Sequence, residues 1–516
     1  MVYHYSKFVN FDEKVQLSAA FNLIRGNGLT EVKYFSVAPD TPVYDHVQRW
    51  PPGYSLVITP FLLLFNNNEF LATTCLDIVM GILFILLVSH LCKTLSVPAG
   101  FTNIAILLSG CFQYYIFIQS FPSDHLALVS LLAATIAGVK IINHQTRLSF
   151  SSYLFISILF FLPYFFRHMY LPVSVLLPLL LILYSLINRN IILRINGIFL
   201  LIGSLLLSTG LLVWLKLYSG EYTYILETQK GIFPNQLLHW YPFMVSAFIN
   251  IESATSYLSA ITGKSYDSVM QLMELINLFF VFVSLCAFVL LIRKNRFKKY
   301  AGNFQFFLIA GTILSAVIIF LLGYLTLTNK PQRFWNYNLD GRYFIFPVVF
   351  LQLLFIIKSS LEWSSVKNTF SNYLQRFLII LLLLEAVHGI FSTIKNITTH
   401  NAENPFPTKR YLNYRRMMTI FDDMNKKYAG RDVLVTSPNQ FFLHAANNAG
   451  FKPIYDFETI NYKQPAVTKK SVLVTVLNDD DSTYMLKYIS EKKPEKFAYE
   501  SFISFFVQEI DPLHIP

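Results

Sequence analysis

The chain has 516 residues, of which 54% are hydrophobic and only 14% are charged, and its mean hydropathy is +0.47. This balance excludes an ordinary soluble globule, because too few polar side chains remain to cover a water-facing surface. The formal net charge of +11 comes from Lys and Arg residues scattered between apolar runs. We interpret it as a signal of membrane topology and expect no nucleic-acid partner.

Residues 1–69 are predicted to form an outer loop with interfacial amphipathic helices. The segment 11–28 has apolar residues at helical spacing, begins with Asp12 and Glu13, and ends in Gly-x-Gly. We expect a short helix that lies on the membrane surface, in contact with membrane lipids. The two acids are candidates for chemistry, although acids at a helix N-terminus also simply favour the helix dipole.

A second outer segment, residues 44–54, carries Arg49 and a Pro-Pro-Gly sequence. The apolar run that follows it, up to Phe65, is shorter than the roughly 20 residues that a crossing helix needs, so it should lie in the interface. Arg49 is a weak candidate, because an interfacial turn anchored by Trp50 carries such charges routinely.

Apolar runs long enough to cross a bilayer recur along the rest of the chain up to residue 394. About ten spans are predicted, over 70–92, 101–118, 124–142, 151–166, 171–187, 197–217, 270–292, 303–326, 343–358 and 377–394.

The charges of the connecting loops predict the orientation. Loops assigned to the cytoplasm by alternation hold thirteen basic residues and one acid, Glu362, which places the N-terminal segment and the C-terminal tail outside the cytoplasm. An outer N-terminal segment of this length needs an upstream signal to be translocated. We therefore expect one further membrane helix before Met1.

The tail, residues 395–516, departs from this apolar pattern. Lys and Arg nearly balance Asp and Glu there, and turn residues separate short apolar runs. The runs 431–439 and 470–477 are typical of buried strands, and 411–427 and 482–492 are typical of helices. The predicted fold is an all-α polytopic membrane protein with a small α/β C-terminal extracytoplasmic domain.

Polar residues stand at the ends of several predicted spans. Asp124 follows Ser123 at the start of the third span, where either residue could serve only as an N-cap. Arg167 and His168 lie between two apolar runs on the outer side. Arginine there either snorkels to the interface or forms a clamp for a phosphate group.

Taken in order, these features resemble the GT-C glycosyltransferases, in the branch of protein O-mannosyltransferases and the aminoarabinose transferase of lipid A, glycosyltransferase family 39-like. The features are an acidic pair, a short helix ending in Gly-x-Gly, a Pro-Pro-Gly-Tyr sequence before an apolar run, Ser123-Asp124, Arg167, Gly341-Arg342-Tyr343 with Pro347, and an outer C-terminal domain. The resemblance covers most of the chain, with residues 70–394 as the transmembrane GT-C-like core. It implies a bacterial plasma (inner) membrane location with the active site outside the cytoplasm.

The resemblance implies that a hexose or pentose moves from a polyprenyl-phosphate-linked donor to an acceptor hydroxyl of a lipid, glycan or protein, with inversion. Such a reaction needs a carboxylate base and cations for the departing phosphate. We expect Asp12 to be the base, Glu13 to orient it or to contact the acceptor, and Asp124 to complete the acidic set. For the donor phosphate we expect Arg342 first, then Arg167, His168, Lys14 and Arg49. No cofactor and no metal site is predicted, although a divalent metal ion is compatible with the chemistry.

Two other classes of function share this composition. A transporter or flippase of lipid-linked sugars would use acids buried within spans, such as Asp77 or Glu385 with His388. A non-catalytic membrane protein would instead use its tail to bind envelope partners. The crowding of charged residues at the outer ends of the spans favours the transferase.

Overall fold

The computed structural model describes residues 11–35, 42–47, 50–119, 122–143, 146–220, 241–249, 251–293, 301–328, 341–362, 370–399, 414–438, 440–454, 470–478, 495–500 and 503–510. The chain divides into two compact units. We call the first the mixed unit; it comprises Met1–Leu76, Leu217–Glu221 and Asn396–Pro516. The helical unit comprises Asp77–Lys216 and Tyr222–Lys395.

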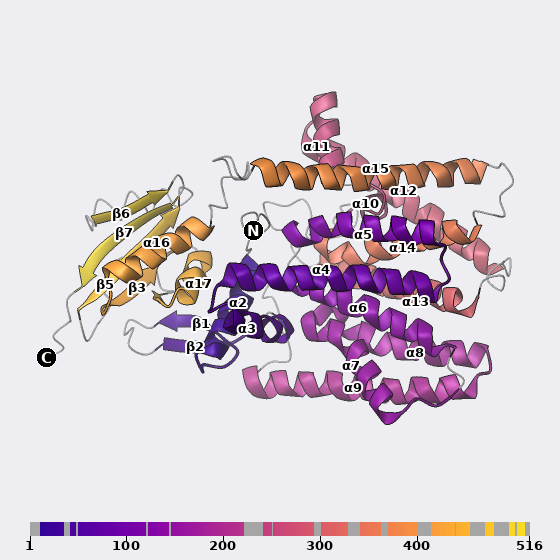
Figure 1. The fold of residues 1–516 in the computed structure, drawn as a ribbon, viewed down its shortest axis with the longest axis horizontal. Helices are drawn as coiled ribbons and strands as arrows, with labels where there is room; N and C mark the ends of the chain where they lie inside the picture. Colours follow the sequence, from indigo (N-terminus) through magenta and orange to yellow (C-terminus); the bar gives the residue numbers. More distant parts are fainter. Residues whose placement is uncertain are drawn as a thin grey trace. The chain divides into compact units, whose positions relative to one another are not determined.

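Long helices make up the helical unit, and many lie side by side with similar axial directions (Figure 1). They are α4 (Glu69–Thr94), α5 (Ala99–Gln119), α6 (Pro122–Ile141), α7 (Phe150–Phe166), α8 (Leu171–Ile187), α9 (Ile191–Ser219), α12 (Tyr266–Arg293), α13 (Gly302–Thr328), α14 (Ile345–Glu362) and α15 (Phe370–Thr399), with the short α10 (Phe243–Ser246) and α11 (Ile251–Thr262). The start of α4 up to Leu76, the end of α9 from Leu217 and the end of α15 from Asn396 belong to the mixed unit. Each of the ten predicted spans coincides with one of the long helices.

The apolar character of these helices makes the chain an integral membrane protein. Within the described residues, five helices are long and apolar enough to cross a membrane, and others are apolar but shorter. Large apolar side chains such as Leu86, Phe155 and Leu206 face outward. An outward apolar surface of this kind is costly in water and is expected where a helix faces lipid.

The packing of α6, α7 and α8 is set by local sequence signals. Ser149 caps α7 by accepting a hydrogen bond from the backbone N–H of Ser152. The helix ends at Phe166, because Arg167 has an extended backbone conformation. A single 3-10 turn, η1 (His168–Tyr170), then leads into α8, whose second residue is a proline. Because α6 packs against α7, the start of α6 faces this turn.

In the mixed unit, the C-terminal part is an α/β domain built on a five-stranded sheet in the order β4-β3-β5-β7-β6. β3 runs parallel to β4 and β5, and β7 runs antiparallel to β5 and β6. The bounds of the strands are Asp432–Thr436 (β3), Lys452–Ile454 (β4), Ser471–Asn478 (β5), Glu495–Glu500 (β6) and Ile503–Ile510 (β7).

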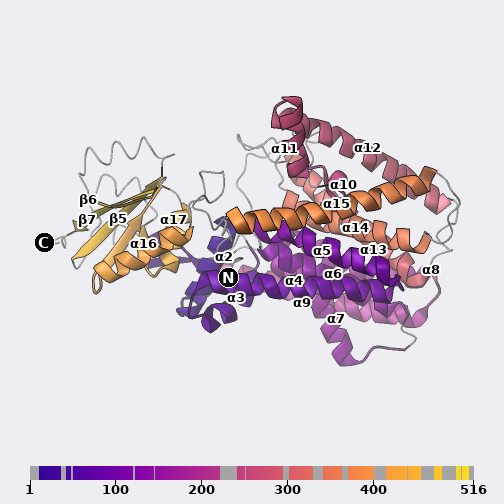
Figure 2. The same cartoon turned by 45° about the horizontal axis from the view of Figure 1, so that its top comes forward.

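Two helices, α16 (Tyr414–Lys427) and α17 (Gln440–Asn448), lie along one face of this sheet (Figure 2). Phe421 of α16 packs edge-on against Phe505 of β7, and both side chains are fully buried. The predicted strands and the predicted helix 411–427 are confirmed. The predicted helix 482–492 lies outside the described residues.

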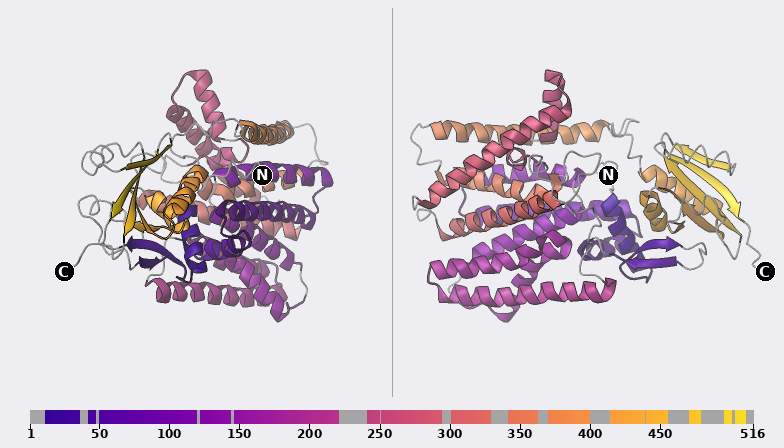
Figure 3. Two further views of the ribbon diagram at one scale, coloured as in Figure 1. Left: turned by 60° about the vertical axis from the view of Figure 1, so that its left-hand side comes forward. Right: turned by 180° about the vertical axis from the view of Figure 1, so that it is seen from behind.

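The N-terminal part of the mixed unit holds α2 (Phe11–Ile24), a hairpin of β1 (Thr30–Phe35) and β2 (Pro42–His46), and α3 (Gly53–Leu64) (Figure 3). The chain leaves α2 through Gly28, whose φ is +75°. The hydroxyl of Tyr218 accepts a hydrogen bond from the backbone N–H of Leu29 at 2.9 Å. A β-carbon at Gly28 would come within 2.7 Å of that hydroxyl oxygen, so this turn requires glycine for two reasons.

α2 does not expose the polar face that an amphipathic helix on a membrane surface would have. Every residue from Glu13 to Asn22 is buried within the mixed unit. The reason is that α2 packs against α3 and also against α17 of the C-terminal domain. The N-terminal segment and the tail, predicted as separate domains, therefore belong to one compact unit.

Candidate active site

The candidate residues fall in both units, and each group has its own surroundings. In the mixed unit, the two acids at the start of α2 have different environments. The Asp12 side chain is partly exposed, whereas Glu13 is only 1% exposed. The hydroxyl of Tyr54, on α3, donates a hydrogen bond to Oε1 of Glu13 at 3.1 Å. Glu13 is thus fixed within the protein, while Asp12 is partly exposed in the first turn of a buried helix.

Lys14 is fully buried in an ion pair with Glu69, in the first turn of α4. Its Nζ donates to both carboxylate oxygens of Glu69, at 2.9 Å and 2.7 Å. Burial lowers the pKa of Lys14, and the charge of Glu69 opposes that change. Lys14 was predicted as a weak candidate for phosphate binding, and its pairing with Glu69 gives it a structural task that the prediction did not include.

In the helical unit, Asp124 and Arg167 form a buried bidentate pair. Asp124 lies in the first turn of α6, and Arg167 lies at the end of α7. The Nε of Arg167 donates to one carboxylate oxygen of Asp124 and Nη2 donates to the other. A bidentate pair of this kind fixes the plane of the guanidinium group as well as its position. The structure thus brings together two residues that were predicted separately.

An aromatic ring contacts this pair, and further polar groups lie close to it along the chain. The guanidinium carbon of Arg167 lies 5.8 Å from the centre of the Tyr343 ring, within reach of a cation–π contact. The partly buried His168 lies beside Tyr164, with 6.1 Å between the ring centres. Ser123 Oγ and the Tyr164 hydroxyl are buried and have no hydrogen-bond partner among the described residues. Buried polar atoms of this kind are costly unless a ligand or water meets them.

The other predicted residues are only partly described. The backbone of Arg342 belongs to the 3-10 turn η4 (Gly341–Phe344) that precedes α14, and its side chain lies outside the described residues, as does the whole of Arg49. Asp77 is buried in α4, and Glu385 pairs with His388 on α15 at 3.7 Å. Within the described residues, no three His, Cys, Asp or Glu side chains converge to hold a metal ion.

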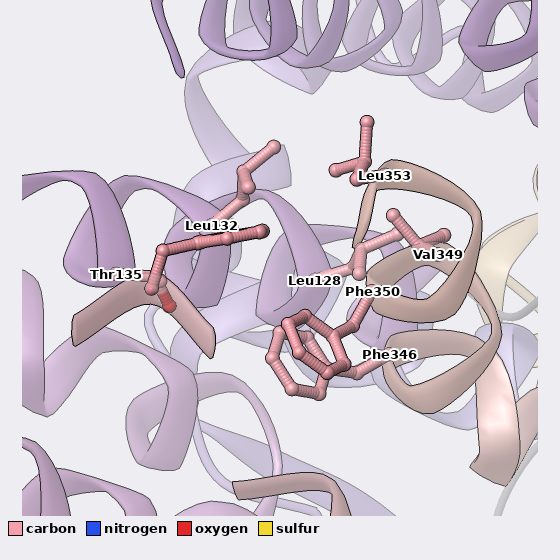
Figure 4. Close-up of a pocket in the computed structure, with 8 residues that line it drawn as sticks. Leu128, Leu132, Thr135, Phe346, Val349, Phe350 and Leu353 are labelled. Carbon is pink, nitrogen blue, oxygen red and sulfur yellow. The ribbon is translucent and has the colours of Figure 1, made fainter. Parts of the chain in front are cut away.

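A small apolar pocket lies between α6, α13 and α14 (Figure 4). Its lining is apolar except for Thr135 and includes the rings of Phe346 and Phe350, which stack on one another. α13 and α14 approach closely beside it, because a β-carbon at Gly311 would overlap the ring of Phe350.

Tyr54, Glu69 and Tyr343 are the partners that sequence reasoning missed. Tyr54 and Tyr343 stand within segments that the sequence singled out, Pro-Pro-Gly-Tyr and Gly-Arg-Tyr, so their aromatic side chains were available as a signal. Glu69 carries no such signal, since an acid at the start of an apolar helix is commonplace.

The chain matches no protein-family model and no curated protein at a significant level. Two solved structures of ArnT from Cupriavidus metallidurans are similar to it. The structure in the apo state has 12% sequence identity and a TM-score of 0.46. The structure bound to undecaprenyl phosphate has 11% identity and a TM-score of 0.43. Each comparison covers 98% of this chain and 95% of the ArnT chain.

Proposed function

We propose that this protein is a membrane glycosyltransferase that moves a sugar from a polyprenyl-phosphate donor to an acceptor hydroxyl, with inversion. The observation that carries the proposal is the difference in exposure between the two acids at the start of α2. α2 is buried from Glu13 to Asn22, and the partly exposed carboxylate of Asp12 stands at its start. A base must be reachable by its substrate and yet held in place, and Asp12 combines these two properties.

In the proposed reaction, Asp12 accepts the proton of the acceptor hydroxyl. The hydroxyl oxygen attacks the anomeric carbon from the face opposite the phosphate, and the bond from that carbon to the phosphate oxygen breaks. The lipid phosphate leaves with the bonding electron pair, and the configuration at the anomeric carbon inverts. Glu13, fixed by Tyr54, helps to hold the start of α2.

Arg167 is proposed to stabilise the negative charge of the donor phosphate. Asp124 occupies the Nε and Nη2 positions of its guanidinium and so orients the group, which carries five N–H donors in all. We therefore assign Asp124 to positioning Arg167. Arg342 and His168 remain proposed phosphate ligands.

The proposed location is the bacterial plasma membrane, with the reaction outside the cytoplasm. The excess of basic residues in alternate loops supports this orientation. The acceptor is a hydroxyl of a lipid, glycan or protein, and a divalent metal ion is not required by the proposed steps.

The test is sugar transfer by the purified protein in lipid nanodiscs, with a panel of radiolabelled polyprenyl-phosphate hexoses and pentoses and a mixed lipid and glycan acceptor fraction. Asp12→Asn keeps the shape of the side chain and removes the base, so transfer should fall by about 10²- to 10⁴-fold. Asp422→Asn, an exposed acid on α16, is the matched control and should leave the rate unchanged.

A flippase gives a different result. In liposomes, a flippase would move the labelled lipid between leaflets without breaking the sugar–phosphate bond, and Asp12→Asn would not change the rate of that movement. Lipid movement without transfer from any donor in the panel would replace the proposed function with this alternative.

A further inference from the structure

A polar stripe along α2 is buried against the C-terminal domain. Lys14, Ser18 and Asn22 are spaced four residues apart, so they share one face of the helix, and Arg25 is the first residue after the helix ends. Polar residues at this spacing would ordinarily face water. Lys14, Ser18 and Asn22 are nevertheless fully buried where α2 packs against α17, so each must find a partner within the protein, whereas Arg25 is exposed.

Two asparagines at the end of α17 supply these partners. Nδ2 of Asn447 donates to Ser18 Oγ at 3.2 Å and to Asn22 Oδ1 at 3.4 Å. The guanidinium of Arg25 donates to the backbone carbonyls of Asn447 and Asn448, at 2.7 Å and 3.1 Å. The last carbonyls of a helix lack partners within the helix and carry partial negative charge, so an arginine there is favourable.

Asn448 connects α17 to the buried ion pair as well. In the amide orientation that satisfies both of its polar atoms, Nδ2 donates to Ser18 Oγ at 2.8 Å and Oδ1 accepts from Lys14 Nζ at 3.1 Å. In the opposite orientation, Nδ2 donates to Glu69 Oε2 at 3.3 Å. Either orientation joins Asn448 to the pair of Lys14 and Glu69.

We propose that Asn447 and Asn448 are positioning residues, through which the C-terminal domain holds the helix that carries Asp12 and Glu13. This inference rests on the proposed function for its catalytic consequence. Lys14 is two residues from Asp12, so a shift of α2 at Lys14 moves Asp12 directly. A misplacement of about 1 Å in a catalytic group can cost about 10²-fold in rate.

The test combines Asn448→Ala and Asn447→Ala in the full chain with two measurements. The first is amide hydrogen exchange of the peptide that covers α2, which should speed up by about 10-fold or more in either variant, while α16 exchanges as in the wild type. The second is steady-state transfer, where kcat should fall by about 10- to 100-fold with the donor KM within about twofold. If the substitutions only reduced the amount of folded protein, fewer molecules would be active, and each active molecule would turn over at the wild-type rate.

Asn425→Ala is the matched control. Nδ2 of Asn425 donates to the carbonyl of Ala449, one residue past α17, but at an exposed site where water can replace it. This variant should show wild-type exchange and wild-type kcat. If Asn448→Ala unfolds the whole unit, the result for Asn447→Ala tests the proposal, because this substitution removes two hydrogen bonds and leaves the contacts of the ion pair unchanged.

Wild-type exchange of α2 in both asparagine variants would overturn the proposal, and so would unchanged kcat together with faster exchange. If the wild-type protein transfers no sugar from any donor, the proposed function fails. In that case, the exchange of α2 still decides whether the asparagines hold this helix.

Discussion

The buried ion pair of Lys14 and Glu69 makes the sharpest energetic prediction. The exposed fractions of its side chains are 0% and 4%, and the two Nζ–O distances are 2.9 Å and 2.7 Å. Lys14→Met replaces the lysine with an apolar chain of similar size and leaves the carboxylate of Glu69 without its cation. Removing one member of such a pair costs about 3–5 kcal/mol, because a buried charge remains uncompensated.

Replacing both members should restore most of that loss. The Lys14→Met, Glu69→Leu double variant removes the two charges together, and an apolar replacement of a whole buried pair is often neutral to within about 1 kcal/mol. The coupling energy of the double-mutant cycle should therefore be about 3 kcal/mol or more in magnitude.

Thermal unfolding of the four proteins in one detergent measures this cycle. For a unit of about 200 residues, each kcal/mol lost from the free energy of unfolding lowers the melting temperature by about 2–4 °C. Lys14→Met should therefore lower the melting temperature by about 10 °C, and the double variant should lower it by only a few degrees. If Lys14→Met melts at the wild-type temperature, or if the double variant loses the sum of the two single losses, the two buried charges do not stabilise one another.

Three further predictions concern other parts of the molecule. Gly28→Ala should destabilise the mixed unit by about 1–3 kcal/mol, because Gly28 has a positive φ and the added carbon would lie close to Tyr218. The control is Gly430→Ala: Gly430 has a similar φ of +83° but no neighbour within 4 Å of the added carbon, so this variant should be destabilised less in the same melting assay. Arg167→Lys keeps the charge but loses the bidentate contact with Asp124, so kcat should fall by about 10-fold or more, and wild-type turnover would contradict the assigned role. Hydrogen bonds from Arg431 and then Lys470 lower the pKa of the exposed Glu509 carboxyl, so its small stabilising contribution is present above pH 4.5 and is lost as the pH falls through the lowered pKa. Glu509→Gln should therefore reduce the loss of stability in acid, and an unchanged dependence of stability on pH would contradict this prediction.

Much of the helical unit could be predicted from the sequence, because the cost of exposing backbone to lipid forces long apolar runs into helices. The paired strands of the tail were equally visible in the runs around Val433 and Val474, which are rich in valine and leucine and are buried. Each of these signals is local, so one sequence is enough to read it.

The surroundings of α2 could not be predicted in this way. Its spacing of polar residues fits a surface helix, and the partners that bury it, Asn447 and Asn448, are more than 400 residues away in the chain. Asp124 and Arg167 were both recognised as polar residues at span ends. Their pairing depends on the packing of α6 against α7, which no local pattern specifies.

The proposed function depends most on the role of Asp12 as the base of a sugar transfer. Its most direct test is the single-turnover rate of transfer from a bound polyprenyl-phosphate sugar, compared between the wild-type protein and Asp12→Asn at saturating acceptor. We expect the variant to bind the donor with unchanged affinity and to transfer the sugar about 10²- to 10⁴-fold more slowly. A variant that transfers the bound sugar within about twofold of the wild-type rate would contradict that role.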